Sequence, residues 1–427
     1  MSRKSLRSIA MLAALVLVLI ACNVIAPLID TPTMRKNAHQ GTAMLSEQYA
    51  VPKMVGGFKS AQLDNFTTVL MIKTAAYTGP ETWLQKAFGG FRTDMPVPEN
   101  ADMQAAWKSF CIYADGSESP TGGLSYSRYW HGYTLPLRIL LCVLNLANIQ
   151  MLMYFVQTAL FVLTVLLMVR RGLGAVVPAF FTAYFLMMPF VLGICLQYMT
   201  ASLLMLFACI VLLAWDKQIH QTVGLPAFFA AVGIVTSFLD LLTFPLVTLG
   251  FPLVLMICLR LKEGDDSRKL FVLFFFCCLG WGLGFGGMWA LKWLITAVCF
   301  GWGYLSSIFS QAFLRVSSES NGASFSRLYA LKMNLDVILE KSGYLLILGL
   351  TGLASLAPAA KTLIQKKCLR IDARALILLL AAAVPLAWYI VMANHSVDHT
   401  YYTYRNLAMA VFSGFAFLSC LTYAEEE

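Results

Sequence analysis

Charged residues are scarce in this chain. Only 12% of its 427 residues are Asp, Glu, Lys or Arg, whereas 59% are hydrophobic. A soluble globular domain carries about 25% charged residues and lacks serial apolar runs of about 20 residues. The composition therefore excludes an ordinary soluble protein and predicts an integral membrane protein. Because backbone polar groups cannot stay unpaired in lipid, we expect an all-α fold.

Metal-binding and disulfide patterns are also missing. The sequence has no Cys-x-x-Cys pair, and most of its eleven cysteines lie inside apolar runs, where they behave as small hydrophobes. His395 and His399 are four residues apart and would share a helix face, which suits a metal. However, the string HSVDH supplies no glutamate base, and no third ligand is evident. We expect no cofactor, with a divalent metal as the minor alternative.

A basic stripe with interleaved aromatics, typical of nucleic-acid binding, is absent despite a net charge of +9. The Lys and Arg residues instead form short clusters between apolar runs, a pattern typical of loops retained in the cytoplasm. We therefore expect membrane lipid rather than nucleic acid as a partner. Every second loop is basic, which predicts that both termini are cytoplasmic.

The apolar runs divide the chain into three parts. Residues 1–28 form a first transmembrane helix, residues 29–134 an external cap loop with short interfacial helices, and residues 135–427 a bundle of about nine further spans. The start resembles a signal peptide, and Leu19 to Cys22 fits a lipoprotein cleavage pattern. We interpret it as an uncleaved span, because a polytopic chain needs no separate lipid anchor.

About ten spans are expected in total. After residues 9–28 they cover 149–169, 175–194, 198–215, 224–240, 243–260, 270–297, 343–359, 374–392 and 405–423, with a short interfacial helix at 135–146. The seventh run is rich in glycine between Gly280 and Gly287, which predicts a kink or an interruption. In the cap, Met103, Ala106, Trp107 and Phe110 have the spacing of an amphipathic helix.

The unusual polar residues fall on the external side in this topology. The richest stretch, NHSVDHTYYTYR at residues 394–405, lies between two apolar runs. Ionisable residues at the mouth of a membrane bundle are costly to place and are usually functional. The candidate site residues are Asp30, Asp64, His131, Asp240, Lys292, His395, His399 and Arg405.

Several of these residues also have ordinary structural interpretations. Asp240 could cap a helix end at a turn, or face Lys292 or Arg405 as a carboxylate partner. Lys292 could extend to the interface between two tryptophans, and His131 could belong to an interfacial aromatic belt. Arg405 suits a phosphate or carboxylate, or alternatively a lipid headgroup. The sequence leaves these alternatives open.

The order of these features resembles the GT-C class of membrane glycosyltransferases. The likeness rests on a first helix followed by a large external loop. It also rests on His131 to Pro136 through Arg171, which is similar to the histidine–proline motif, interfacial helix and second span of such enzymes. Soon after the first helix the chain has only Asp30, where the class has an acidic pair. The strings YSRYWHGY, SFLDLLTFP and NHSVDHTYYTYR are similar to those of a group of bacterial multi-spanning membrane proteins.

The resemblance implies that a sugar passes from a polyprenyl-phosphate donor to a glycan or lipid acceptor at the outer face of the cell membrane. Asp64 or Asp30 would act as the general base, and Asp64 is preferred because Asp30 lies so close to the first helix. The substrate- and phosphate-binding residues would be His131, Asp240, Lys292, His395, His399 and Arg405, with Arg405 neutralising the leaving phosphate.

Two other classes of function remain as alternatives. A lipid or polymer transporter or flippase would place ionisable residues near the middle of the bilayer, in discontinuous spans of related halves. A non-catalytic scaffold would bind a partner through residues 29–134. A closed cavity lined by Asp64, Arg405 and the histidines would favour the enzyme over both alternatives.

Overall fold

The computed structural model describes residues 3–116, 122–320, 322–366 and 370–423, and helices make up most of it. The strands in these ranges are two residues long: β1 (Glu319–Ser320) pairs with β2 (Ala323–Ser324), and β3 (Arg370–Ile371) pairs with β4 (Thr422–Tyr423). The all-α prediction is confirmed.

Long apolar helices form the body of the molecule. Six stretches of the described chain are long and apolar enough to cross a membrane: Arg3–Leu28, Leu146–Arg170, Leu196–Thr222, Ser267–Phe300, Ser342–Lys361 and Ala373–Val391. They contain α1 (Arg3–Ile25), α7 (Leu146–Arg170), α10 (Leu196–Thr222), α13 (Ser267–Phe300), the larger part of α16 (Ser342–Lys366) and α17 (Leu376–Val391). These helices indicate a membrane-embedded protein.

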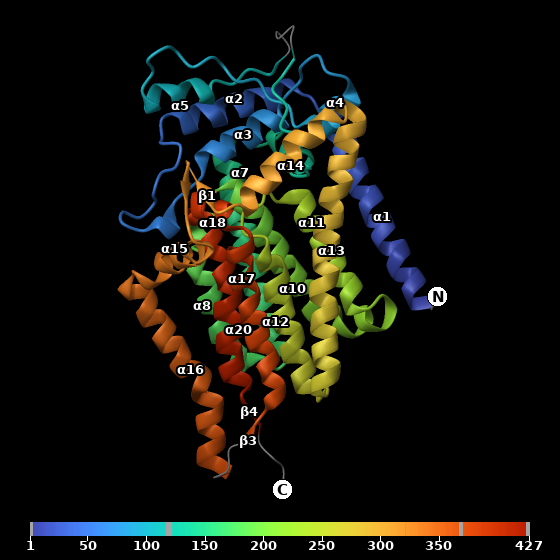
Figure 1. Ribbon diagram of the computed structural model, residues 1–427, viewed down its shortest axis with the longest axis vertical. Coiled ribbons are helices and arrows are strands. Elements are labelled where there is room, and N and C mark those ends of the chain that lie inside the picture. Colours follow the sequence, from blue (N-terminus) through green and yellow to red (C-terminus); the bar gives the residue numbers. More distant parts are fainter. Residues whose placement is uncertain (1–2, 117–121, 321, 367–369, 424–427) are drawn as a thin grey trace.

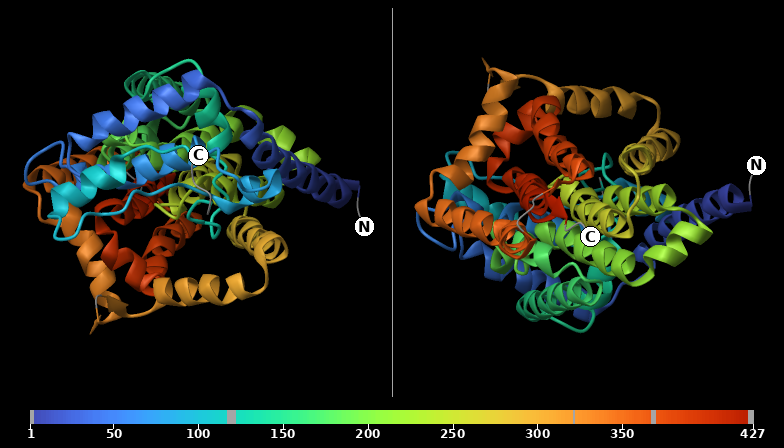
Figure 2. Two further views of the ribbon diagram at one scale, coloured as in Figure 1. Left: turned by 90° about the horizontal axis from the view of Figure 1, so that it is seen from above. Right: turned by 90° about the horizontal axis from the view of Figure 1, so that it is seen from below.

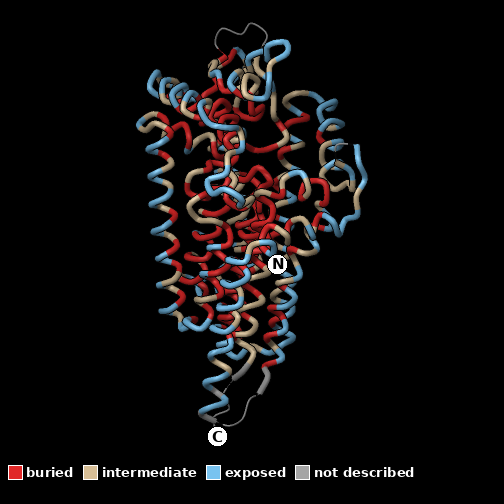
Figure 3. The backbone as a smooth tube through the Cα atoms, turned by 90° about the vertical axis from the view of Figure 1, so that its left-hand side faces the viewer, coloured by how far each residue is buried: buried red, intermediate tan, exposed pale blue. Residues whose placement is uncertain are grey.

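Shorter apolar helices complete the bundle. They are α8 (Val177–Leu186), α9 (Pro189–Leu192), α11 (Leu225–Leu239), α12 (Leu246–Glu263) and α20 (Leu407–Cys420). Helix α12 is buried along almost its whole length, with α10, α13, α17 and α20 packed around it. Exposed positions follow the outlying helices, whereas buried positions gather in the middle of the bundle and beneath the cap (Figure 3).

The segment between α1 and α6 (Thr134–Leu141) forms a cap across one end of the bundle. It contains α2 (Pro32–Ser46), α3 (Asn65–Ala75), α4 (Trp83–Gly89) and α5 (Met103–Cys111). Helices α2, α3 and α5 lie across the direction of the long helices (Figure 1), and α1 projects to one side when the molecule is seen from above (Figure 2). The predicted amphipathic helix is α5, with Trp107 buried and Met103 exposed.

Two helices have no counterpart among the expected spans. Helix α14 (Gly303–Val316) turns back from the cap end of α13, and α15 (Arg327–Leu339) follows it to α16. Helix α14 packs against α13 and against α18 (Ala393–Asp398). The stretch 394–405 forms α18, α19 (Thr400–Thr403) and the start of η5 (Tyr404–Asn406), so it lies beside α14 at the cap end.

The prediction of a kink in the glycine-rich run is wrong, because α13 is one continuous helix of 34 residues. Its glycines instead allow close packing against α11. A Cβ atom on Gly280 would lie 2.4 Å from the Pro226 carbonyl oxygen, and one on Gly284 would lie 2.1 Å from that of Ala230. Small residues four apart let membrane helices approach backbone to backbone.

We expect Gly284→Ala to lower the melting temperature of the solubilised protein, because the added carbon would force α11 away from α13. Overpacking of this kind costs about 1–3 kcal/mol. Gly286→Ala is the matched control, since nothing lies within 4 Å of its Cβ position. In thermal unfolding followed by circular dichroism, the control should melt at or above the wild-type temperature. Equal melting temperatures for the two variants would contradict the packing role.

Candidate functional site

A cavity of about 370 Å³ lies between the cap and the stretch 394–405. This volume falls within the range of small-molecule sites. The cap contributes Asp64 and Thr67, and the bundle contributes His395 and His399. The full lining is Ala50, Val51, Asp64, Phe66, Thr67, Leu70, Tyr126, Tyr129, Gln197, Leu241, Arg315, His395, His399, Tyr401 and Tyr402. We call this space the Asp64 cavity.

Asp64 enters the cavity from the N-terminus of α3. Its Oδ1 accepts a hydrogen bond from the Thr67 backbone N–H at 2.8 Å, and its Oδ2 accepts one from Thr67 Oγ1 at 2.9 Å. Oδ2 also accepts from the Tyr401 hydroxyl at 3.1 Å, which joins the cap to the 394–405 stretch. Burial raises the pKa of Asp64, and the hydrogen bonds from Thr67 and Tyr401 oppose that rise. The site thus holds a carboxylate with a raised proton affinity.

Arg315 faces this carboxylate region from the end of α14. Its Nη1 donates a hydrogen bond to His399 Nε2 at 3.1 Å, so His399 must be neutral with its proton on Nδ1. Burial, reinforced by the charge of Arg315, lowers the pKa of His399 to about 4. No carboxylate among the described residues forms an ion pair with Arg315. Its charge is therefore open to an anionic ligand.

His395 is fixed in the other tautomer. Its Nε2 lies 2.7 Å from the Leu242 carbonyl oxygen and must donate to it, which leaves Nδ1 without a proton. Burial lowers the pKa of His395, with His399 and Arg315 adding to the effect. The two imidazole rings are 4.9 Å apart, and His399 stacks on Tyr402 at 5.1 Å. Both histidines are thus neutral, and each is held by a hydrogen bond and ring contacts.

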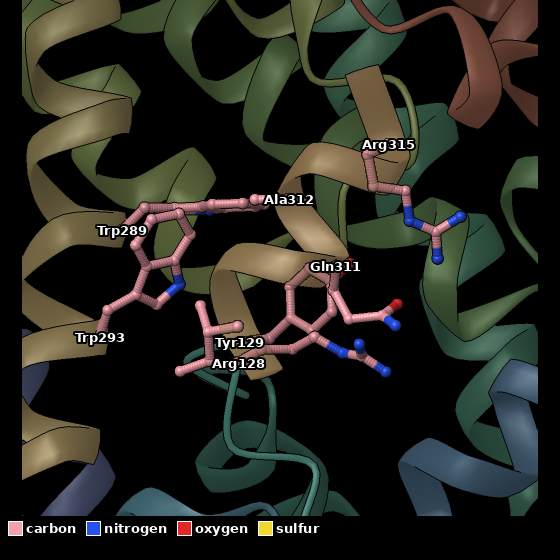
Figure 4. Close-up of a pocket in the computed structure, with 8 residues that line it drawn as sticks. Arg128, Tyr129, Trp289, Trp293, Gln311, Ala312 and Arg315 are labelled. Carbon is pink, nitrogen blue, oxygen red and sulfur yellow. The ribbon is translucent and has the colours of Figure 1, made fainter. Parts of the chain in front are cut away.

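A second, smaller pocket of about 20 Å³ adjoins the Asp64 cavity and shares Tyr129 and Arg315 with it. Figure 4 shows the guanidinium groups of Arg128 and Arg315 and the amide of Gln311 on one side, with the indoles of α13 on the other. Arg128 stands over the Tyr126 ring at 4.6 Å. The smaller pocket is lined by Arg128, Tyr129, Trp289, Trp293, Ile308, Gln311, Ala312 and Arg315. Two cations and an aromatic wall therefore extend the cavity towards α13.

Arg405, expected to bind phosphate, does not line the cavity. It is fully buried, and it donates to three backbone carbonyl oxygens: Met187 at 2.9 Å, Tyr401 at 3.0 Å and Ser60 at 3.0 Å. The guanidinium carbon also lies 4.4 Å from the centre of the Tyr198 ring. These contacts tie the cap and the bundle to the 394–405 stretch, and they give each nitrogen of the buried guanidinium a backbone partner.

Lys292 and Asp30 also lie outside the cavity lining. Lys292 is buried and donates to the Phe88 carbonyl oxygen, which ties α13 to α4. Its ammonium lies 5.8 Å from the Trp130 ring centre, so it does not extend to the interface. Asp30 forms a partly exposed ion pair with Arg35 at 2.9 Å.

Asp240 stabilises the turn that positions His395 in the cavity wall. Its carboxylate accepts from the backbone N–H of Thr243 at 2.8 Å and from the hydroxyls of Thr243 and Thr200, as expected for a cap at a turn. Within the described chain, Lys292 and Arg405 donate to backbone carbonyl oxygens and form no ion pair with Asp240. The turn holds Leu242 at φ 65° and directs its carbonyl to His395. Asp240 therefore supports the histidine without lining the cavity.

His131 supports the opposite wall. Its Nε2 donates to the Tyr126 carbonyl oxygen at 2.7 Å, and its Nδ1 accepts from the Tyr133 hydroxyl at 2.9 Å. Burial lowers its pKa to about 3, so it is neutral. The residue is enclosed by rings of the protein itself, and it positions Tyr126, which does line the cavity.

Sequence reasoning missed Arg315 because the expected spans left residues 298–342 without an element. The signal was present: the apolar residues Leu305, Ile308, Phe309, Ala312, Phe313 and Val316 have the i, i+3, i+4 spacing of an amphipathic helix. That helix is α14, and Arg315 lies one residue before its end. Tyr401, which bonds Asp64, lay within the stretch already selected.

The site shows no cluster of three or more His, Cys, Asp or Glu residues that could hold a metal, a finding that covers only the described part of the chain. Comparison of the chain with protein families, with curated proteins and with solved structures finds no match. The geometry of the Asp64 cavity is therefore the basis for any functional conclusion.

We expect acid to destabilise the protein through its neutral histidines. Native His399 binds a proton more weakly than the unfolded chain, so its contribution is complete above pH 6.5 and is lost as the pH falls towards 4. The loss is at most about 1.4 kcal/mol per pH unit. His399→Gln keeps an acceptor for Arg315 and should flatten the fall in melting temperature between pH 6.5 and 4.

The control for this pH series is His39→Gln, which changes an exposed histidine of α2. It should reproduce the wild-type pH dependence. Melting curves of His399→Gln that run parallel to the wild type across this window would contradict the buried neutral state.

Proposed function

We propose that the protein is a membrane glycosyltransferase that moves a sugar from a polyprenyl-phosphate donor to a hydroxyl of a glycan or lipid acceptor. The observation that carries the proposal is the meeting of Asp64 with the 394–405 stretch in one cavity, joined by the Tyr401 hydrogen bond of 3.1 Å. A group transfer of this kind needs a proton acceptor and a cation for the leaving phosphate in the same space.

The roles follow from the chemistry of the cavity lining. The acceptor oxygen bonds to the anomeric carbon while its proton passes to the Asp64 carboxylate. The bond between that carbon and the phosphate oxygen breaks, and its electron pair stays on the phosphate. Arg315, aided by Arg128, stabilises the negative charge that develops there. His399 holds the Arg315 guanidinium in place by accepting one of its hydrogen bonds.

In this proposal Arg315 binds the phosphate, whereas the sequence pointed to Arg405. Arg405 donates to three carbonyl oxygens, whereas the one hydrogen bond that Arg315 forms within the described structure is to His399. A guanidinium with free donors and no carboxylate partner is suited to bind a phosphate. Lys292 and Asp240 keep structural roles, in α13 packing and in the 240–245 turn.

We propose ten membrane spans, both termini in the cytoplasm and the site at the outer face of the cell membrane. The spans would be α1, α7, α8, α10, α11, α12, α13, α16, α17 and α20. Support comes from the basic residues at the bundle end away from the cap, including Arg171, Lys217 and Lys262. Transport is less well supported, because the ionisable residues of the Asp64 cavity gather at the cap end and not midway along the bundle.

We expect Asp64→Asn to lower the rate of sugar transfer about 100-fold or more, because a general base contributes about 10²–10⁴-fold. Asn remains a good helix N-cap, so the start of α3 should persist. The assay follows a radiolabelled sugar from polyprenyl-phosphate donors into membrane glycans. Asp30→Asn is the control, since Asp30 pairs with Arg35 outside the cavity. Full activity in Asp64→Asn would rule out the base.

We expect Arg315→Gln to weaken binding of polyprenyl phosphate about tenfold or more, because a charge-assisted hydrogen bond contributes about 1.5–3 kcal/mol. Arg315→Lys should recover only part of the affinity, since an ammonium lacks the fork of donors. Binding is measured by the thermal shift that the lipid produces. Lys332→Gln on α15 removes the same charge at an exposed position and should bind as the wild type does. If Arg315→Gln binds the lipid as tightly as the wild type, Arg315 does not bind the phosphate.

A further inference from the structure

A second basic site lies at the end of the bundle away from the cap. Helices α7, α10 and α12 end around a hollow of about 500 Å³. Its charged lining consists of Arg171, Lys217, Lys262 and Glu263, so cations outnumber carboxylates by three to one. Gln218, Ala214 and Leu259 complete the wall. We call this space the basic hollow.

A buried ion cluster lies beside the basic hollow and shares Arg171 and Glu263 with its lining. Asp216 is fully buried and pairs with Arg260, and Arg171 Nη2 lies 3.5 Å from the same carboxylate oxygen. Arg260 Nη1 also pairs with Glu263 at 2.5 Å. The other oxygen of Asp216 and the Nε of Arg260 are buried without a partner. With Lys217 and Lys262 added, the cluster keeps an excess of two positive charges.

Two backbone features bring these cations together. Helix α10 has non-helical angles at Trp215 (φ −125°, ψ 20°), directly before Asp216. Gly172 has φ +72°, and a Cβ atom there would lie 2.1 Å from Lys262 Nζ. Its absence lets Lys262 donate to the Arg171 carbonyl oxygen at 2.8 Å. The ammonium of α12 is thus held over the end of α7.

Apolar side chains beside the hollow face outwards. On α7, Leu166 and Val169 are 55% and 56% exposed, and Trp215 on α10 is 53% exposed. In a membrane-embedded bundle such side chains contact acyl chains, and tryptophan prefers the level of the headgroups. The hollow therefore combines cations for a phosphate with an adjoining surface for a lipid tail.

We propose that the basic hollow binds the phosphate headgroup of an anionic phospholipid. Basic pockets between membrane helices recognise such headgroups through their charge. The bound lipid joins the ends of α7, α10 and α12, and its phosphate offsets one of the two excess positive charges of the cluster. This assignment is independent of the Asp64 cavity and of sugar transfer.

The test measures binding of phosphatidylglycerol to the full-length protein by native mass spectrometry, with phosphatidylcholine as the neutral comparison. The double variant Lys217→Gln/Lys262→Gln leaves the buried cluster intact. It should lose about 30-fold in affinity for phosphatidylglycerol, because each basic residue near an anionic surface contributes about fivefold. The matched control Arg268→Gln/Lys269→Gln removes two charges from the start of α13, outside the hollow, and should bind as the wild type does.

Equal loss in the two double variants, or equal binding of both lipids by the wild type, would overturn the assignment. A competition with glycerol 3-phosphate separates a lipid from a free phosphate. Weak competition supports the lipid, whereas displacement at the same concentration as phosphatidylglycerol would show that the hollow takes a soluble phosphate instead. A melting temperature measured for each variant without lipid identifies any loss of fold.

Discussion

The buried guanidinium of Arg405 holds the cap on the bundle. It donates to carbonyl oxygens from three separate parts of the chain, namely residue 60 in the cap, residue 187 after α8 and residue 401 in α19. A buried cation is costly unless each donor is satisfied, and an unpaired carbonyl in the same place is costly too. The two requirements are met only when these segments take their observed positions. The wall that brings Tyr401 to Asp64 depends on that arrangement.

The Asp64 cavity and the smaller pocket beside it combine a carboxylate of raised proton affinity with two neutral imidazoles and two arginines that lack carboxylate partners in the described structure. A structural ion network would pair opposite charges. Here the arginine of α14 is instead directed by a neutral ring, and a strained turn fixes the second ring. Strain and unpaired charge persist at places where a ligand can compensate them. The basic hollow differs, because its excess positive charge lies beside a buried carboxylate that is already paired.

Most of the helical framework could be predicted from the sequence, because apolar length alone selects membrane helices. The meeting of the cap with residues 394–405 was also foreseen, since ionisable residues with no lipid-facing role gather at one end. The roles of individual residues were harder to foresee. In the sequence, Arg405 and Lys292 cannot be distinguished from cations that bind an anionic ligand. Only the tertiary structure shows that both donate to backbone carbonyls of distant segments. Arg315 was missed because a short amphipathic helix lacks the length of a span. The glycines of α13 were misread because a helix break and a close helix contact select the same residue.

Asp64 has two tasks in one carboxylate: it begins α3, and it faces the cavity. A neutral carboxyl accepts hydrogen bonds less strongly than a carboxylate, so any proton that Asp64 takes up weakens its hydrogen bond to the first turn of that helix. The same proton weakens the bond from Tyr401 to the cap. One side chain therefore couples the start of α3 to the 394–405 stretch, and both contacts respond to the same proton.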